Sequence, residues 1–250
     1  MLTLRWGAAT DVGRVRKLNE DSLLAVPPLF VVADGMGGHA AGEVASQLAV
    51  AEFARLAEQP TVGADDLAET VRQANEHILS AGAERGDRYG MGTTLTGIGV
   101  VGTTDGEQLA VFNVGDSRVY RFHDGRLDQL TVDHSAVQEL VDAGRLTPQA
   151  ARTHPRRNVV TRSLGSQPGP APDVWLVPPV TGDRYLVCSD GLTGELEDPA
   201  IAELLGTADD PQAAADELVR LALAAGGHDN VTVVVLDVAE PTDEAAGEPS

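Results

Sequence analysis

One short stretch constrains this chain more than any other: an apolar run over residues 30–33 that ends at Asp34 and leads into a cluster of glycines. A β-branched run of this length predicts a buried strand, so Asp34 lies at the strand's exit, where its carboxylate can point into a cleft. Gly35, Gly37 and Gly38 let the backbone turn sharply and bring carbonyl groups close to whatever the carboxylate holds. A hard cation takes oxygen ligands of both kinds. A plain Asp-Gly turn is the alternative interpretation of this window.

The same pattern of a strand followed by Asp-Gly recurs at residues 184–189, which precede Asp190 and Gly191. Other apolar runs are separated by tight turns. Pro27-Pro28 divides residues 22–26 from residues 29–33, and residues 104–107 divide 95–103 from 108–114. Further strands are expected at residues 2–10, 119–122 and 231–238. Strands joined by turns rather than helices imply antiparallel pairing.

Helical periodicity appears at residues 40–59 and 65–84, and two successive helices between strands favour a helical layer covering a sheet. In the first of these helices, Val44, Leu48 and Leu56 are expected on the apolar face, with Glu52 and Arg55 off it. Residues 135–153 predict a helix broken at Gly144 that restarts at Thr147-Pro148, as an N-cap and N1 pair, and residues 211–225 predict the last helix. We expect one domain over residues 1–238 and a disordered acidic tail over residues 239–250.

Composition excludes several classes of function. The net charge of −20 over 250 residues leaves no basic stripe for nucleic acid. No run of about twenty apolar residues exists, so we expect no membrane segment, and the N-terminus lacks the features of a signal peptide. Aromatic residues make up only 4%, so the core must consist of Val, Leu and Ala. Cys188 is alone, which excludes an intramolecular disulfide and favours the cytoplasm.

Five acids each stand at the end or the start of an apolar run: Asp21, Asp34, Asp116, Asp190 and Asp229. Sheet ends gather site residues, so the five carboxylates can converge. Packed carboxylates repel one another and raise each other's pKa unless cations occupy the site. Two divalent ions about 3.5–4 Å apart would offset this charge and create a hydroxide nucleophile. The alternative is that each Asp serves separately as a turn or cap residue.

Six motifs in order carry a resemblance to a known family. They are Arg16-x-x-Asn19-Glu20-Asp21, residues 33–39 (Ala-Asp-Gly-Met-Gly-Gly-His), Gly92-Thr93-Thr94, Gly115-Asp116-Ser117-Arg118, Cys188-Ser189-Asp190-Gly191 and Asp229-Asn230. Over about residues 5 to 238 the chain resembles the PP2C (PPM) family of metal-dependent protein serine/threonine phosphatases, in its short bacterial form. The resemblance implies an α+β fold, a four-layer α-β-β-α sandwich in which two central antiparallel sheets are flanked by helices.

The resemblance also implies a ligand set for Mn²⁺ or Mg²⁺. Asp34 and the carbonyl of Gly35 match the ligands that bridge two ions. Asp190 and Asp229 match ligands of one ion, and Asp21 and Glu20 match those around the other, Glu20 through water. Asp116, with Asp190, matches a third, weaker site. Oxygen-only ligands fit Mg²⁺ or Mn²⁺ better than Zn²⁺.

Further residues take their expected roles from the same resemblance. Arg16 matches the arginine that grips the substrate phosphate, which suits a guanidinium because it can bind two phosphate oxygens at once. Thr93 and Thr94 match buried hydroxyls that support the metal-binding strands. Met36 stands where some members carry a histidine proposed as the general acid, and it cannot donate a proton. His39, His134 or a metal-bound water is therefore left for that role, with His39 the first candidate.

The basic segment over about residues 135–167 matches the family's flap beside the active site. Its arginines, namely Arg152, Arg156, Arg157 and Arg162, either attract an acidic phosphorylated segment or are simply solvated. The partners implied are phosphorylated proteins, including Ser/Thr kinases and their substrates, and we expect a monomer.

Competing functions are disfavoured to different degrees. Cys188 cannot be the nucleophile of a Cys-x₅-Arg phosphatase because position 194 is glycine, and no P-loop motif occurs. The net charge disfavours a two-metal nuclease. A phosphatase fold that binds without cleaving would lack a metal ligand, and none of the matched acids is missing. A phosphatase directed at one partner, of the anti-sigma-factor antagonist type, stays open.

Overall fold

The hairpin that carries Asp34 forms as the sequence predicts. In the computed structural model, which describes residues 2–37, 41–84, 90–104 and 106–240, β2 (Asp21–Val26) and β3 (Leu29–Met36) pair in antiparallel fashion on either side of Pro27-Pro28. The register sets Asp21 directly opposite Asp34. The hairpin alone therefore places two of the predicted site acids side by side.

Strands are arranged in two sheets in which every pairing is antiparallel. The first sheet has the order β2-β3-β5-β6-β9, with the short β4 beside β3. Its further members are β4 (Gly92–Thr93), β5 (Leu95–Thr103), β6 (Gly106–Val114) and β9 (Asp173–Val177). The second sheet has the order β1-β11-β10-β7-β8. It consists of β1 (Thr3–Asp11), β7 (Arg118–His123), β8 (Arg126–Gln129), β10 (Arg184–Cys188) and β11 (Val231–Ala239).

Alternation along the strands builds the layers, because successive side chains point to opposite faces of a sheet. In β3, Leu29 and Val31 pack toward helices, whereas Phe30 and Val32 enter the core between the two sheets. Residues 231–238 of β11 alternate in the same way between the helical side and the core between the sheets. All of these side chains are buried, so each sheet separates two apolar cores.

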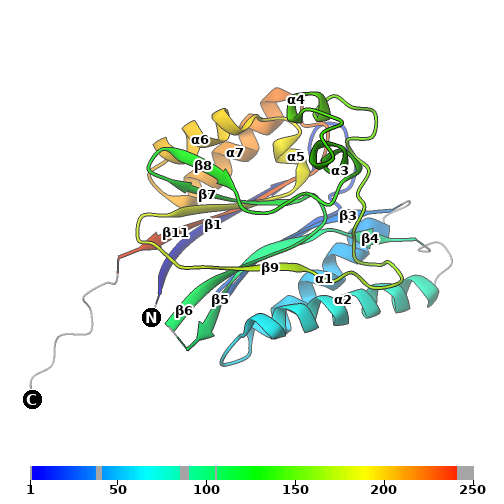
Figure 1. Cartoon of the computed structure of the whole chain (residues 1–250), viewed down its shortest axis with the longest axis horizontal. Coiled ribbons are helices and arrows are strands. Elements are labelled where there is room, and N and C mark those ends of the chain that lie inside the picture. The colour runs from blue at the N-terminus through cyan, green and yellow to red at the C-terminus, as the bar shows by residue number, and fades with distance from the viewer. Residues whose placement is uncertain (1, 38–40, 85–89, 105, 241–250) are drawn as a thin grey trace, which may run out of the picture.

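Helices cover the outer face of each sheet, which confirms the predicted four-layer α-β-β-α sandwich (Figure 1). The helices α1 (Ala41–Ala57) and α2 (Ala64–Glu84) lie on the first sheet. The helices α5 (Asp190–Thr193), α6 (Asp198–Thr207) and α7 (Pro211–Ala225) lie on the second. No helix in the described ranges is long and apolar enough to cross a membrane.

The segment over residues 135–167, called the flap from here on, begins with two short helices, α3 (Ala136–Asp142) and α4 (Pro148–Ala151). The predicted restart is confirmed, since Thr147 caps α4 by accepting from the Ala150 amide and Pro148 begins the helix. The base of the flap is closed by backbone hydrogen bonds: the Ala136 amide donates to the Val159 carbonyl at 2.8 Å, and the Thr161 amide to His134 at 2.8 Å.

Several expectations about single elements were wrong or incomplete. Glu52 was expected off the buried face of α1, but its side chain is only 7% exposed because it binds Arg55 and His77. The strands β8 and β9 and the helix α6 were not predicted. The last strand, β11, runs to Ala239, one residue into the predicted tail, and residues 241–250 lie outside the described residues.

Candidate active site

Asp34 is held by its backbone. Its amide donates to the Thr94 hydroxyl at 2.9 Å, while its carbonyl accepts from the Thr94 amide and the Thr93 hydroxyl, both also at 2.9 Å. Both threonines are buried, as the supporting role expected for them requires. Burial, together with the charges of Asp21 and the other acids, raises the pKa of the Asp34 carboxyl well above its usual range. The main chain therefore fixes the position of a carboxylate in a strongly acidic setting.

Asp21 lies opposite Asp34 in the hairpin and has one carboxylate oxygen without a hydrogen-bond partner among the described residues. Its Oδ2 accepts from the Ser189 hydroxyl at 2.8 Å, whereas its Oδ1 is buried without a hydrogen-bond partner among the described residues. Burial, with the charges of Asp190 and Asp229, raises the pKa of Asp21 to about 7. An orphaned buried carboxylate oxygen is costly unless something binds it, so this atom indicates a missing partner.

Asp190 and Asp229 lie near each other because the segment that follows β10 packs closely against the segment that precedes β11. Asp190 begins α5 directly after β10, and Asp229 precedes β11. A Cβ at Gly191 would lie 1.9 Å from the carbonyl oxygen of Asn230, so only glycine permits this approach. Burial and the charge of Asp229 raise the pKa of the Asp190 carboxyl.

Asp116 comes from the turn between β6 and β7. Gly115 makes this turn with a φ of +114°, where its neighbour Thr94 leaves no room for a Cβ. Asp116 is 7% exposed, and burial together with the charges of Asp190 and Asp133 raises its pKa to about 8. The Ser117 hydroxyl lies 2.8 Å from the Thr94 hydroxyl, so the same threonine connects the backbone of Asp34 to the side chain that follows Asp116.

A pocket of about 260 Å³ gathers these groups. Six of the seven predicted ligands border it, the exception being the buried Asp21. Its lining consists of Arg16, Glu20, Asp34, Gly35, Met36, Gly37, Thr94, Asp116, Asn158, Val160, Asp190 and Asp229. Across the described ranges, however, no three His, Cys, Asp or Glu side chains are already arranged to hold one ion. The acids therefore share a pocket without forming a ready ligand cluster among the described residues.

The donor set fits a hard divalent cation. Its donors are carboxylate oxygens together with the Gly35 carbonyl, with no thiol or imidazole among the pocket residues. Oxygen donors of this kind suit Mg²⁺ and Mn²⁺. The raised pKa of four carboxyls and the orphaned Oδ1 of Asp21 both indicate positive charge that the protein's own side chains do not supply.

Arg16 is the cation closest to these acids. Its guanidinium donates to Asp229 at 2.7 Å, and the hydrogen bond to Asp229 raises the pKa of the arginine. Its side chain is 49% exposed, so the remaining N–H groups are accessible. A surface arginine could also pair with Glu20, four residues along the chain, but among the described ion pairs Arg16 binds Asp229 and not Glu20. A phosphate entering the pocket would meet a guanidinium positioned beside the acids.

Asn230, to which the sequence analysis gave no role, fastens the loop that carries Arg16. Its amide Nδ2 donates to the carbonyls of Val12 and Leu18, both at 2.9 Å, and its Oδ1 accepts from the Glu20 amide at 2.8 Å. Asn230 is 5% exposed. Its place directly after Asp229, between a turn and a strand, was the available signal, since a buried asparagine there must find partners.

Glu20 reaches the pocket from the end of this loop. Its carbonyl accepts from the Ser46 hydroxyl at 2.6 Å and from the Gly35 amide at 3.2 Å, which ties the loop to α1 and β3. A Cβ at Gly42 would lie 2.7 Å from the Glu20 Oε1, so the glycine leaves space for the carboxylate.

The two histidines considered as proton donors, His39 and His134, have different standing in the structure. His39 lies outside the described residues. His134 has both ring nitrogens engaged: Nδ1 accepts from the Gly115 amide at 3.0 Å, which leaves the proton on Nε2 for the bond to Asp173 at 2.9 Å. His134 therefore supports the turn that carries Asp116 and is not free to donate a proton to substrate. Met36 lines the pocket directly after Gly35.

The flap arginines differ from one another. Arg162 binds Asp173 at 2.8 Å, so its charge is compensated. Arg152 donates to the Thr193 carbonyl, at the end of α5, at 3.2 Å. Arg156 and Arg157 are exposed and precede Asn158, which borders the pocket. Of these four, Arg156 and Arg157 are the two whose side chains form no ion pair or hydrogen bond in the described residues, and they lie nearest in sequence to the pocket residue Asn158.

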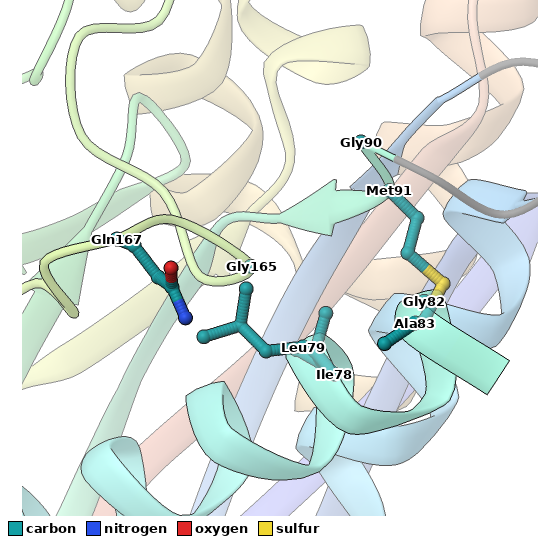
Figure 2. Close-up of a pocket in the computed structure, with 8 residues that line it drawn as sticks. All are labelled: Ile78, Leu79, Gly82, Ala83, Gly90, Met91, Gly165 and Gln167. Atoms are coloured by element: carbon teal, nitrogen blue, oxygen red, sulfur yellow. The ribbon is translucent and has the colours of Figure 1, made fainter.

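Two other features carry no reacting group. Cys188 is buried in β10, and burial raises the pKa of its thiol to about 12, as expected of an inert core cysteine. A second pocket, of about 370 Å³, lies between the end of α2 and the flap's return to the sheet, with Ile78, Met91 and Gln167 on its wall (Figure 2). No ionisable side chain lines this second pocket.

Comparison with known proteins identifies related chains. The model of the family described as "Protein phosphatase 2C" matches residues 15–221. The "Serine/threonine protein phosphatase PstP" of Mycobacterium tuberculosis is 45% identical over 242 residues, which are 96% of this chain and 46% of the relative. The chain thus spans about half the length of this relative. The "Serine/threonine phosphatase stp" of Listeria monocytogenes is 37% identical over 91% of this chain and 93% of its own.

The similar solved structures are also those of phosphatases. The catalytic domain of PstP in complex with two manganese ions has a TM-score of 0.88 and 43% identity, covering 96% of this chain and all of that one. The phosphatase MsPP of Mycobacterium smegmatis, in complex with cacodylate, has a TM-score of 0.85 and 41% identity, covering 94% and 98%.

Proposed function

This chain belongs to the protein phosphatase 2C family, and from that premise we propose that it hydrolyses phosphoserine and phosphothreonine in proteins with the help of divalent cations. The observation that carries the proposal is the convergence of Asp34, Asp116, Asp190 and Asp229 on one pocket that Arg16 also borders. Acids alone would repel a phosphate, so a phosphate site here needs both the cations and the guanidinium.

The cation ligands are proposed as follows. Asp34 and the Gly35 carbonyl would contribute to two ion sites, Asp190 and Asp229 would complete one of them, and Asp21 and Glu20, the latter through water, would complete the other. Asp116 with Asp190 would hold a third ion more weakly, and this assignment is supported by the place of both residues on the wall of the same pocket. When bound, divalent cations neutralise the acids and lower the pKa of water enough for it to attack phosphorus. The PstP structure with two manganese ions supports the choice of Mn²⁺, with Mg²⁺ as its chemical equivalent.

Arg16 binds the phosphate. Its pairing with Asp229 aims the guanidinium at the pocket, and a phosphate can accept from the N–H groups that Asp229 does not occupy. Asn230 holds the loop that carries Arg16 by three hydrogen bonds, so the guanidinium is placed before substrate arrives.

The leaving alkoxide needs a proton, and Met36 cannot supply it. His134 is committed to Gly115 and Asp173. We therefore keep His39 as the proposed acid, with water as the alternative donor.

The proposed setting follows from the same chemistry. Phosphorylated proteins, including Ser/Thr kinases and their substrates, are the partners, and residues 1–238 are the catalytic unit, acting as a monomer. The buried free thiol of Cys188 favours a reducing compartment, for which we propose the cytoplasm.

Turnover of a phosphothreonine peptide tests the proposal. Phosphate release is measured with Mn²⁺, with Mg²⁺ and after chelation by EDTA. We expect release that depends on added metal and stops with chelator. Release that persists in EDTA at the full rate would contradict the metal-dependent mechanism, and no release with either metal would contradict the activity.

A further inference from the structure

The flap carries positive charge that the rest of the protein neutralises only in part, at Arg162. Residues 143–163 contain five arginines and no Asp or Glu, in a chain of net charge −20. Two of the five, Arg156 and Arg157, are here called the flap pair. Both are exposed, and within the described part of the chain neither side chain forms an ion pair or a hydrogen bond. Most other described arginines bind an acid, as Arg118, Arg121 and Arg184 do.

The flap pair stands at the edge of the active-site pocket. Asn158, which follows Arg157 directly, and Val160 both line that pocket. The backbone at the pair is ordered by a turn, in which the Arg156 amide donates to the His154 Nδ1 at 3.1 Å and the Arg157 amide to the His154 carbonyl at 3.0 Å. Two unpaired guanidinium groups are thus presented from a defined backbone within one or two residues of the pocket wall.

The flap's fixed position keeps the pair there. Hydrogen bonds between residues 134–136 and 159–161 close its base. Arg152 joins its far side to the Thr193 carbonyl of α5, the helix that begins with Asp190. The flap pair is therefore held relative to the acids of the pocket.

We propose that Arg156 and Arg157 bind a second phosphate on the substrate, a few residues along the chain from the phosphoresidue in the pocket. An extended peptide advances about 3.3 Å per residue, so a residue two or three positions away lies within about 10 Å of the pocket. A phosphate carries a charge of about −1.5 to −2 and accepts bidentate bonds from guanidinium groups, so it gains more from the pair than a carboxylate does. The substrate class is a doubly phosphorylated segment. This inference rests on the proposed phosphatase function.

Charge explains why such a pair is useful in this protein. A net charge of −20 repels an acidic peptide at a distance. A local cationic edge offsets that repulsion for a peptide already near the pocket, and salt screens the attraction because the Debye length is about 10 Å at 0.1 M. The preference for a second phosphate is therefore expected to shrink as NaCl is added.

The test compares three peptides that differ at one position, two residues from a phosphothreonine: a second phosphothreonine, a glutamate or a glutamine. For the unaltered protein we expect kcat/KM for the doubly phosphorylated peptide to exceed that for the glutamine peptide by about five- to twentyfold at low salt. In the double variant Arg156→Gln/Arg157→Gln the ratio falls to within about twofold of one, while hydrolysis of p-nitrophenyl phosphate is unchanged. Both side chains are exposed and form no ion pair or hydrogen bond in the described chain, so the variant is expected to fold.

A matched control removes two positive charges from another part of the surface. Arg72→Gln/Arg220→Gln removes two exposed helical arginines from α2 and α7 and alters the net charge equally. This control should keep the preference for the second phosphate. Loss of the preference in the control, or an equal preference for glutamate, would overturn the assignment to the flap pair.

Binding separates this inference from the proposed function. Fluorescence anisotropy in Mn²⁺ with phosphonate analogues of the doubly and singly phosphorylated peptides, which cannot be hydrolysed, measures the two affinities without turnover. A tighter complex with the doubly phosphorylated peptide that the flap-pair variant loses supports the inference even if no peptide is hydrolysed. Equal affinities of the unaltered protein for the two peptides would overturn it, even if both peptides are hydrolysed.

Discussion

Thr94 connects the backbone of Asp34 to the side chain of Ser117, next to Asp116, and its replacement by valine is expected to weaken metal binding without changing a ligand. The hydroxyl of Thr94 accepts from the Asp34 amide at 2.9 Å and lies 2.8 Å from the Ser117 hydroxyl, and the side chain is 1% exposed. Valine keeps the shape and removes this acceptor, so a buried N–H beside the central carboxylate loses its partner.

The magnitude follows from that lost partner. A buried donor left unsatisfied costs about 1–3 kcal/mol, which for a domain of this size lowers Tm by about 3–10 °C. Removing groups that orient metal ligands typically lowers metal affinity about ten- to a hundredfold. We expect the loss of stability to appear as a lower Tm in EDTA. We expect the loss of metal affinity to appear in a Mn²⁺ titration that is followed by calorimetry and by phosphopeptide turnover.

Thr96→Val provides the control. Thr96 is also fully buried, but its hydroxyl donates to the Phe112 carbonyl at 3.2 Å and does not contact the Asp34 backbone. We expect this variant to lose some stability and to keep its Mn²⁺ affinity. If Thr94→Val binds Mn²⁺ within twofold of Thr96→Val, the threonine does not position the metal site and our interpretation of its hydroxyl is wrong.

Three further predictions concern the reacting groups. Asp34→Asn and Asp190→Asn should each abolish phosphopeptide turnover and weaken Mn²⁺ binding, because each removes a charged ligand; near-normal turnover at saturating Mn²⁺ would exclude the two-ion site. Arg16→Ala should raise KM for phosphopeptides about ten- to a hundredfold. Mn²⁺ binding should not weaken, because the variant removes a positive charge beside the ligand Asp229 and not a ligand; an unchanged KM would make Arg16 structural. His39→Ala should slow phosphoserine peptides far more than p-nitrophenyl phosphate, whose phenolic leaving group needs little protonation; equal effects on both substrates would remove His39 as the acid.

The sequence predicted the framework because alternation and turn residues are local signals. The run that ends at Asp34 is a strand buried on both faces, and Pro27-Pro28 closes its hairpin. Thr147-Pro148 begins α4 as expected. The order of strands in the sheets depends on long-range packing, which local patterns do not contain.

Other features could not be predicted from the sequence because they depend on partners that are distant along the chain. Glu52 is charged and was placed on the exposed face of α1, yet Arg55 and His77 compensate for its burial. Arg162 was grouped with the flap arginines, but Asp173, on the unpredicted strand β9, neutralises it. The engagement of both nitrogens of His134 likewise needs the Gly115 turn and β9 together.

The same holds for the candidate site. The acids could be found from the sequence because each follows or precedes an apolar run. Their mutual placement could not, since it depends on the close approach of Gly191 to Asn230 and on the three hydrogen bonds that Asn230 makes.

Crystals of the protein grown with Mn²⁺ and measured at the manganese absorption edge would test the central claim most directly. Anomalous scattering locates manganese without assumptions about activity. We predict two strong peaks in the pocket, both within coordination distance of Asp34, with Asp190 and Asp229 at one of them, and loss of the peaks in Asp34→Asn crystals. Peaks only at surface acids outside this pocket, or a pocket without manganese at saturating concentration, would contradict the account.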